Sequence, residues 1–145
     1  MDLVRPDANR TLRKSALGAM TEEIEQALIW RMAGPSAGLR VLDVGSGDGA
    51  YAIVAAQLGA RVAGVDAWPQ MIEAARRHAA GQNVQIDRPV ADAAALPFDD
   101  GSFDVVLAVT VLCFVADANT ALRGMARVVA PGGRLVIGEL GRWNA

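Results

Sequence analysis

Three closely spaced glycines follow a short apolar run and suggest a loop that binds a polar ligand. Gly45, Gly47 and Gly49 come directly after 41–44 and precede an alanine-rich stretch. Glycine lets the backbone turn sharply and approach a ligand closely, because it has no Cβ. A helix beginning after such a loop presents unpaired N–H groups and a partial positive charge. The pattern therefore predicts a loop that holds a small ligand through its backbone.

A carboxylate stands at the distance from this loop that ribose recognition requires. Asp66 ends a second apolar run, at 61–65, and lies 21 positions after Gly45. In the pattern G-x-G-x-x-A, which Ala50 completes, an acidic residue about 20 positions further on accepts ribose hydroxyls. The loop and Asp66 together indicate an adenosine-type ligand. The alternatives are a tight turn without a ligand and a carboxylate that only caps the next helix.

The elements that must position these residues alternate between strand-like runs and helical patterns. An N-terminal helix is expected with Thr21 as its N-cap and an end at Gly34. Strands are expected at 40–44, 61–66, 84–90, 103–109 and 135–138, and helices at 50–58, 69–80 and 117–130. This alternation predicts an α/β fold whose parallel sheet is covered by helices on both faces. In such sheets ligands bind at the carboxyl ends of the strands, where the glycine loop lies.

Four segments in this order resemble class I S-adenosylmethionine-dependent methyltransferases, particularly the type 11 small-molecule group. They are 41–49, 64–66 with Met71 and Ala75-Arg76, 92–106, and 129–135. The resemblance covers about residues 38–140. It implies a Rossmann-like doubly wound parallel sheet of strand order 3-2-1-4-5. It also implies a cofactor-binding domain at 38–145, whereas the N-terminal helical segment at 1–37 is predicted from the helical pattern of the residues.

The same resemblance implies S-adenosyl-L-methionine as the cofactor and a set of residues that bind it. Gly45, Ser46 and Gly47 form the loop along the methionine and ribose, and Asp66 holds the ribose. The remaining implied contacts are Ala67 and Met71 on the adenine, Asp92 with Ala93 at its exocyclic amine, and Thr110 near the methionine end.

Asp43 separates this cofactor from a nicotinamide dinucleotide. It stands two positions before Gly45, where its charge would repel a pyrophosphate. A ligand that carries an ammonium and a sulfonium is compatible with an acid here. An NAD-dependent oxidoreductase is therefore the less favoured alternative, since the single tyrosine, Tyr51, falls in the first helix after the loop.

The expected chemistry is transfer of a methyl group to a small-molecule acceptor, which the sequence does not identify. Such a transfer requires alignment of the reacting atoms and needs a general base only when the acceptor has a proton to lose. No catalytic residue is assigned. Cys113 is expected to be a small buried hydrophobic residue rather than part of an acceptor pocket.

The composition disfavours several other classes of protein. Fourteen basic and sixteen acidic residues give a net charge of −2, so no nucleic-acid-binding surface is expected. One cysteine and one histidine disfavour a disulfide scaffold and a zinc site. The longest apolar stretch, 105–116, is shorter than the ~20 residues of a membrane helix, so a cytoplasmic protein without a membrane partner is expected.

The sheets of the family this sequence resembles end in a β-hairpin, and we expect it to be missing here, because seven residues follow Gly138. We expect a C-terminally short member of the family, with a non-catalytic cofactor-binding fragment as the alternative. The last strand, 135–138, would then form an open apolar edge, which is prone to pairing. This edge predicts a homodimer, with Trp143 in the contact.

Overall fold

The computed structural model describes residues 16–34 and 37–139 and divides the chain into two units, Met1–Met32 and Ala33–Ala145. Helix α2 (Ala16–Ala33) accounts for the described part of the first unit and ends, as predicted, at Gly34, whose φ is 53°. Thr21 is not an N-cap, because it lies inside α2 and its hydroxyl donates to the carbonyl of Leu17 at 2.7 Å. The alanine-rich residues before Thr21 favour helix, so α2 begins earlier than predicted.

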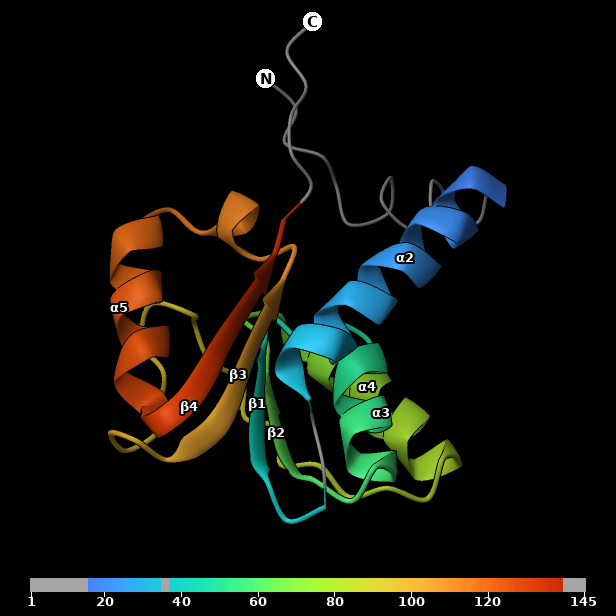
Figure 1. The fold of residues 1–145 in the computed structure, drawn as a ribbon, viewed down its shortest axis with the longest axis horizontal. Helices are drawn as coiled ribbons and strands as arrows, with labels where there is room; N and C mark the ends of the chain where they lie inside the picture. The colour runs from blue at the N-terminus through green and yellow to red at the C-terminus, as the bar shows by residue number, and fades with distance from the viewer. Residues whose placement is uncertain (1–15, 35–36, 140–145) are drawn as a thin grey trace, which may run out of the picture. The chain divides into compact units, whose positions relative to one another are not determined.

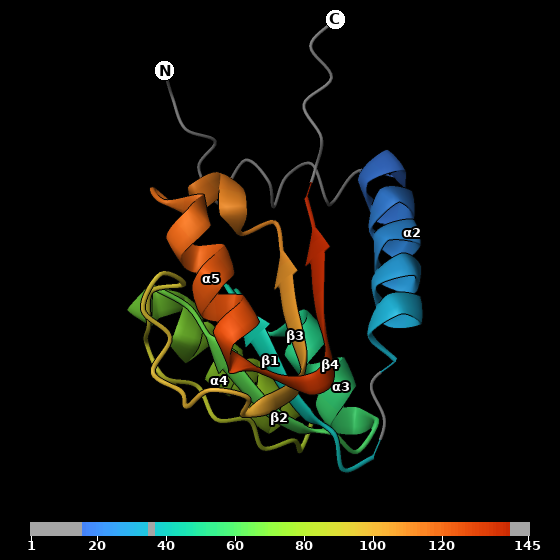
Figure 2. The same cartoon turned by 60° about the vertical axis from the view of Figure 1, so that its left-hand side comes forward.

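The second unit is built on a parallel sheet with helices on both faces, as the alternating pattern predicted. Strands β1 (Arg40–Val44), β2 (Arg61–Val65), β3 (Phe103–Val109) and β4 (Val129–Gly138) are arranged in the order β2-β1-β3-β4. Figures 1 and 2 show α3 (Ala50–Gln57) and α4 (Pro69–Gly81) on one side of the sheet and α5 (Ala118–Val128) on the other. The right-handed crossovers of βαβ units require this division of the helices.

The predicted third strand, at 84–90, is not formed. Two isolated parallel bridges, Ala63 with Asp87 and Asp66 with Val90, join this segment to the β2 side of the sheet. Pro89 lies between the bridges and has no N–H to continue a ladder. The predicted order 3-2-1-4-5 is therefore corrected to four strands, whose neighbours are otherwise those expected.

The core combines aliphatic side chains of all sizes from the strands and the helices of the second unit with Phe103 and Met125. Helix α5 begins at Asp117, whose carboxylate accepts the N–H of Thr120 at 3.0 Å. Its buried residues, Ala121, Met125 and Val128, recur at helical spacing and face the sheet. The central strands β1 and β3 are buried along nearly their whole length, as expected for parallel strands covered on both faces.

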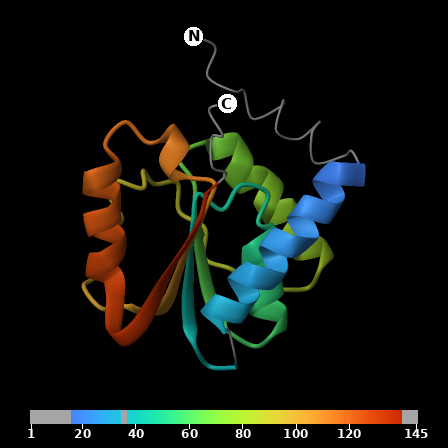
Figure 3. The same ribbon diagram turned by 45° about the horizontal axis from the view of Figure 1, so that its top comes forward.

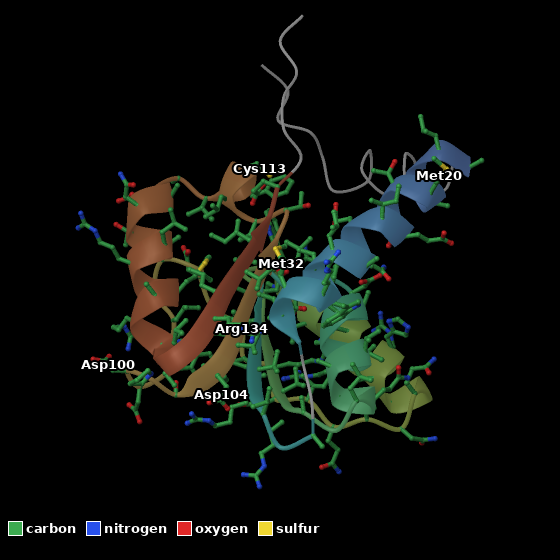
Figure 4. The ribbon with its side chains drawn as sticks, in the orientation of Figure 1. Met20, Met32, Asp100, Asp104, Cys113 and Arg134 are labelled. Atoms are coloured by element: carbon green, nitrogen blue, oxygen red, sulfur yellow. The ribbon has the colours of Figure 1, made fainter. Side chains whose placement is uncertain are left out.

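The two ends of the sheet differ in chemistry. At the amino ends of the strands, Arg40 forms an ion pair with Asp104 at 2.9 Å, which joins β1 to β3. Figure 4 shows Asp104 and Arg134 toward this end and Cys113 toward the opposite one. The carboxyl ends, turned toward the viewer in Figure 3, carry the glycine loop. Among the described residues no helix is long and apolar enough to cross a bilayer.

The predicted turn at 131–133 is a bulge inside β4, and it provides a test of packing. A Cβ on Gly133 would lie 2.7 Å from the carbonyl oxygen of Asp104 and 2.8 Å from that of Ala130. We expect Gly133→Ala to lower the free energy of unfolding by about 1–3 kcal/mol, because these backbone atoms cannot move aside freely. Gly81→Ala is the control, since nothing lies within 4 Å of a Cβ there. Urea unfolding measures both, and equal stabilities of the two variants would contradict the prediction.

Candidate functional site

The glycine loop connects β1 to α3 in a backbone conformation that glycine favours. Gly45, Gly47 and Gly49 have φ angles of 66°, 54° and 85°. Between them, the N–H of Ser46 donates to the carbonyl of Val65 at 2.9 Å, which fixes the loop to the end of β2. The first helical bond, from Ile53 N–H to the Gly49 carbonyl at 2.8 Å, begins α3 directly after the loop. The predicted arrangement of strand, glycine loop and helix is therefore present.

Two of these glycines lie against side chains from other segments. A Cβ on Gly45 would lie 2.6 Å from Cγ2 of Val111, which follows β3. A Cβ on Gly49 would lie 2.7 Å from Nη1 of Arg88. The loop thus needs glycine here both for its φ angles and for close contact with its neighbours.

Asp66 connects the glycine loop to the start of α4. One carboxylate oxygen accepts the N–H of Gly47 at 3.0 Å, and the other accepts the N–H of Trp68 at 2.9 Å. Trp68 is the N-cap residue of α4, so Asp66 orders this helix terminus as well as the loop. The carboxylate itself is buried at the end of β2. Ligand binding and local capping, which the sequence left as alternatives for Asp66, are compatible in this geometry.

Asp43 is buried beneath the loop. It is the second-to-last residue of β1 and stands two positions before Gly45. Burial raises the pKa of its carboxyl to about 7, against the opposing effects of the Arg88 charge and the Ala52 N–H. No described group hydrogen-bonds its Oδ2 atom, and the hydroxyl of Ser46 is likewise buried without a partner among the described residues. Buried polar atoms of this kind are normally satisfied, so two of them beside the glycine loop make this part of the fold the candidate site.

Thr110, directly after β3, has a backbone conformation that β-branched residues rarely adopt. Its φ is 55°, its N–H donates to the carbonyl of Gly138 at 2.7 Å, and its Oγ1 atom is buried without a described partner. Strained residues of this kind are concentrated at functional sites. Thr110 lies next to Val111, which contacts the loop at Gly45, so its position agrees with a place near the ligand.

The other predicted contacts lie around the same end of the sheet. A Cβ on Gly47 would be 3.6 Å from Cε of Met71, so Met71 is close to the loop. Ala67 is exposed directly after Asp66. Asp92 is exposed and accepts the N–H of Ala94 at 2.8 Å, while the carbonyl of Ala93 faces α5. Among the described residues no hydrogen bond joins Asp92, Ala93 or Thr110 to the glycine loop.

Cys113 is exposed, which corrects the expectation that it is buried. The run after β3 does not continue as a strand but forms a short 3-10 turn, η1 (Leu112–Phe114), that directs Cys113 outward. Partial burial and the neighbouring carboxylate of Glu139 raise the pKa of the thiol, so its neutral form is favoured.

Glu139 was not predicted, although it holds the loop after β3. Its Oε1 atom accepts the N–H groups of Val111 at 2.9 Å and Leu112 at 2.7 Å. It stands directly after β4, so the signal that could have found it is an acidic residue at the carboxyl end of a strand. Through Val111, Glu139 also supports the contact with Gly45.

We expect Glu139→Ala to lower the free energy of unfolding by about 1–3 kcal/mol, because two backbone donors lose a charged acceptor. Glu139→Gln, which keeps an acceptor oxygen, should lose less. Glu73→Ala is the control, since Glu73 is exposed on α4 and forms only long ion pairs of 3.7 Å. Urea unfolding and amide exchange at Val111 and Leu112 measure the effect. Unchanged exchange at these two amides in Glu139→Ala would contradict the prediction.

Comparison with known proteins identifies the family. A family model described as a methyltransferase domain matches residues 42–137, from the first strand to the end of the last one. The chain belongs to this methyltransferase family. The resemblance noted in the sequence to class I S-adenosylmethionine-dependent methyltransferases is thereby confirmed.

Relatives of this methyltransferase domain include a ubiquinone biosynthesis O-methyltransferase from Xanthomonas oryzae pv. oryzae, which is 39% identical over 110 residues. That alignment covers 75% of this chain and 46% of the relative, so the chain spans less than half of the curated protein. Another ubiquinone biosynthesis O-methyltransferase, from Methylocella silvestris, is 42% identical over 108 residues, which are 74% of this chain and 42% of the relative. Among solved structures, a putative S-adenosyl-L-methionine-dependent methyltransferase from Methanococcus maripaludis has a TM-score of 0.76 at 25% identity. It covers 96% of this chain, which in turn covers 65% of that structure.

Proposed function

We propose that this chain binds S-adenosyl-L-methionine and uses it to methylate a small molecule. The observation that carries the proposal is the carboxylate of Asp66, which meets the glycine loop at Gly47 on the carboxyl edge of the sheet. Membership of a methyltransferase family supports the reaction type. The names of the curated relatives favour a hydroxyl oxygen as the acceptor atom.

The chemistry of the site residues fits this cofactor. The carboxylate of Asp66 suits the hydroxyl groups of a ribose. At Gly47 the Cβ position meets only Cε of Met71, at 3.6 Å, so the loop backbone can be approached closely there. Asp43 supplies negative charge behind the loop for a ligand that carries an ammonium and a sulfonium. The full proposed set is Asp43, Gly45, Ser46, Gly47, Asp66, Ala67, Met71, Asp92, Ala93 and Thr110, all within the proposed cofactor domain 38–145.

The bound cofactor supplies a methyl group activated on a sulfonium. The residues of this chain bind and orient the ligand, and alignment alone can contribute about 7–11 kcal/mol to such a reaction. Asp66 holds two backbone segments, at Gly47 and Trp68, in one fixed relation, and this preorganises the ribose end. Val111 contacts the loop from the β3 side, at Gly45.

Calorimetry with S-adenosylhomocysteine tests the binding, and transfer of labelled methyl groups to a panel of small phenols tests the reaction. We expect saturable binding of one ligand per chain and no change in NADH fluorescence on titration. Binding without transfer to any phenol would favour the non-catalytic fragment. Absence of binding, or tight binding of NADH, would overturn the proposal.

We also propose that two copies pair along β4, which lies at one edge of the sheet. Open strand edges are templates for pairing, and Ile137 on β4 is 36% exposed. Trp143, predicted in the contact, lies outside the described residues. Light scattering at about 100 μM should give the mass of a dimer for the native chain and of a monomer for Ile137→Lys. Leu58→Lys, at an exposed position after α3, is the control and should remain dimeric. A monomeric native chain would contradict the proposal.

A further inference from the structure

Arg88 is a buried cation that the binding site described above does not use. It lies between the two bridges that join segment 84–90 to β2, and its side chain is 3% exposed. All three of its guanidinium nitrogens are buried without a hydrogen-bond partner among the described residues. A buried charge is costly unless it is compensated, so a guanidinium in this position requires an opposite charge nearby.

The guanidinium of Arg88 lies directly behind the glycine loop. A Cβ on Gly49 would lie 2.7 Å from Nη1 and 2.8 Å from Nη2, and one on Gly64 would lie 3.7 Å from Nη1. The Cβ position of Gly64 is also 3.2 Å from the hydroxyl oxygen of Ser46. Ser46 and Arg88 therefore lie on the same side of β2, under the first turn of α3. The backbone of the loop at Gly49 therefore packs directly against the guanidinium of Arg88.

Asp43 is the buried carboxylate on the same side of the sheet as this cation, because it pairs with Gly64 across β1 and β2, and Nη1 of Arg88 lies 3.7 Å from the Cβ position of Gly64. The two side chains form no ion pair within 4 Å, so their charges act on each other at longer range. Arg88 is the positive charge that acts on Asp43, whereas Asp66 and Asp48 act on it with the opposite sign. Arg88 in turn is influenced by Asp43 and Asp48, and by the positive charge of Arg76. Of these, Asp48 and Arg76 are exposed, whereas Asp43 and Arg88 are both buried. The pair is therefore shielded from solvent, and each charge has its largest effect on the other.

We propose that Arg88 is a positioning residue of the cofactor site, which supports the glycine loop at Gly49 and keeps Asp43 ionised behind it. The effect of Arg88 on ligand binding rests on the proposed function, because an ionised Asp43 favours a ligand with an ammonium group. A neutral Asp43 would lose this preference. Recognition of the amino-acid part of the cofactor then depends on a residue that lies behind the loop, outside the set of predicted contacts.

The charge coupling can be tested without any ligand. The carboxyl carbon of Asp43 is followed by NMR between pH 5 and 9 in the native chain, in Arg88→Met and in the control Arg77→Met. Arg77 is exposed on α4, and its side chain forms only a long ion pair with Glu73 at 3.7 Å. Burial opposes ionisation of Asp43 and Arg88 favours it, so the pKa of about 7 should rise by about 1 unit or more in Arg88→Met. It should stay unchanged in Arg77→Met, and an unchanged titration in Arg88→Met would overturn the proposal.

The effect on recognition is tested with two ligands at pH 7.5. S-adenosylhomocysteine carries the ammonium group, whereas 5′-methylthioadenosine lacks the amino-acid part. A rise of about 1 unit in the pKa lowers the ionised fraction of Asp43 at pH 7.5 about threefold, so Arg88→Met should bind the first ligand at least about threefold more weakly than the native chain, with recovery toward pH 8.5, and the second with nearly native affinity. Equal losses for both ligands would indicate a merely structural role and overturn the proposal.

If Arg88→Met does not fold, Arg88→Lys decides the question, because it keeps the positive charge and replaces the planar guanidinium with a compact ammonium group. Asp43 should then titrate near its native pKa, whereas a rise as large as that expected for a neutral residue would overturn the proposal. If the native chain binds neither ligand, the proposed function fails, and the NMR titration still decides whether Arg88 controls Asp43.

Discussion

Replacing Asp66 by Asn is expected to weaken S-adenosylhomocysteine binding by about 100-fold. The two oxygens of Asp66 accept the N–H groups of Gly47 and Trp68. An asparagine has one acceptor oxygen, so its NH₂ group must face a second donor. Loss of one of these bonds loosens the loop before any ligand binds. The proposed contact with the ribose hydroxyls is itself charged, and a hydrogen bond to a charged group contributes about 1.5–3 kcal/mol, so its loss accounts for roughly a 10- to 150-fold weaker binding.

Asp99→Asn is the matched control, because Asp99 is exposed in the turn before β3 and accepts the Ser102 hydroxyl through its backbone carbonyl, at 2.7 Å, and not through its carboxylate. It removes the same charge and should bind the ligand with native affinity. Thermal unfolding of each variant distinguishes a loss of binding from a loss of fold. A native affinity in Asp66→Asn would contradict the central role of this carboxylate.

The sheet could be predicted from the sequence where strands are buried on both faces. The boundaries of β1 and β3 agree with the expected runs at 40–44 and 103–109, because continuous apolar residues leave few alternatives. The segment 84–90 lies at the side of β2 away from the other strands and contains Pro89. The pairing of this segment with β2 could be predicted from the sequence. Its division into two isolated bridges could not, because that depends on the one N–H that Pro89 lacks.

The site could be predicted where residues contact one another through a local pattern, and not where distant side chains meet. From the glycine spacing and Asp66, the loop and its carboxylate could be predicted to lie together at the carboxyl ends of the strands. Arg88 and Glu139 were not predicted, because their importance depends on burial and on hydrogen bonds between segments far apart in sequence. Cys113 was misjudged for a similar reason, since an apolar run after a strand does not reveal that the chain turns outward.

The largest effect on stability is expected from Gly45→Ala. A Cβ at this position would be 2.6 Å from Cγ2 of Val111, and the φ of 66° is itself unfavourable for alanine. The left-handed conformation costs roughly 1–2 kcal/mol, and overpacking adds about 1–3 kcal/mol. We expect the free energy of unfolding to fall by about 2–5 kcal/mol. Movement of the loop away from Val111 should also weaken S-adenosylhomocysteine binding at least tenfold.

Gly38→Ala separates the two contributions, because Gly38 has a φ of 84° and nothing within 4 Å of a Cβ. It should show only the conformational cost, so the difference between the two variants measures the contact with Val111. In Gly45→Ala combined with Val111→Ala the contact is removed, and the double variant should lose less stability than the two single changes added together. Urea unfolding of the four chains provides these values. Additive losses, or equal losses in Gly38→Ala and Gly45→Ala, would show that Val111 does not restrict the loop.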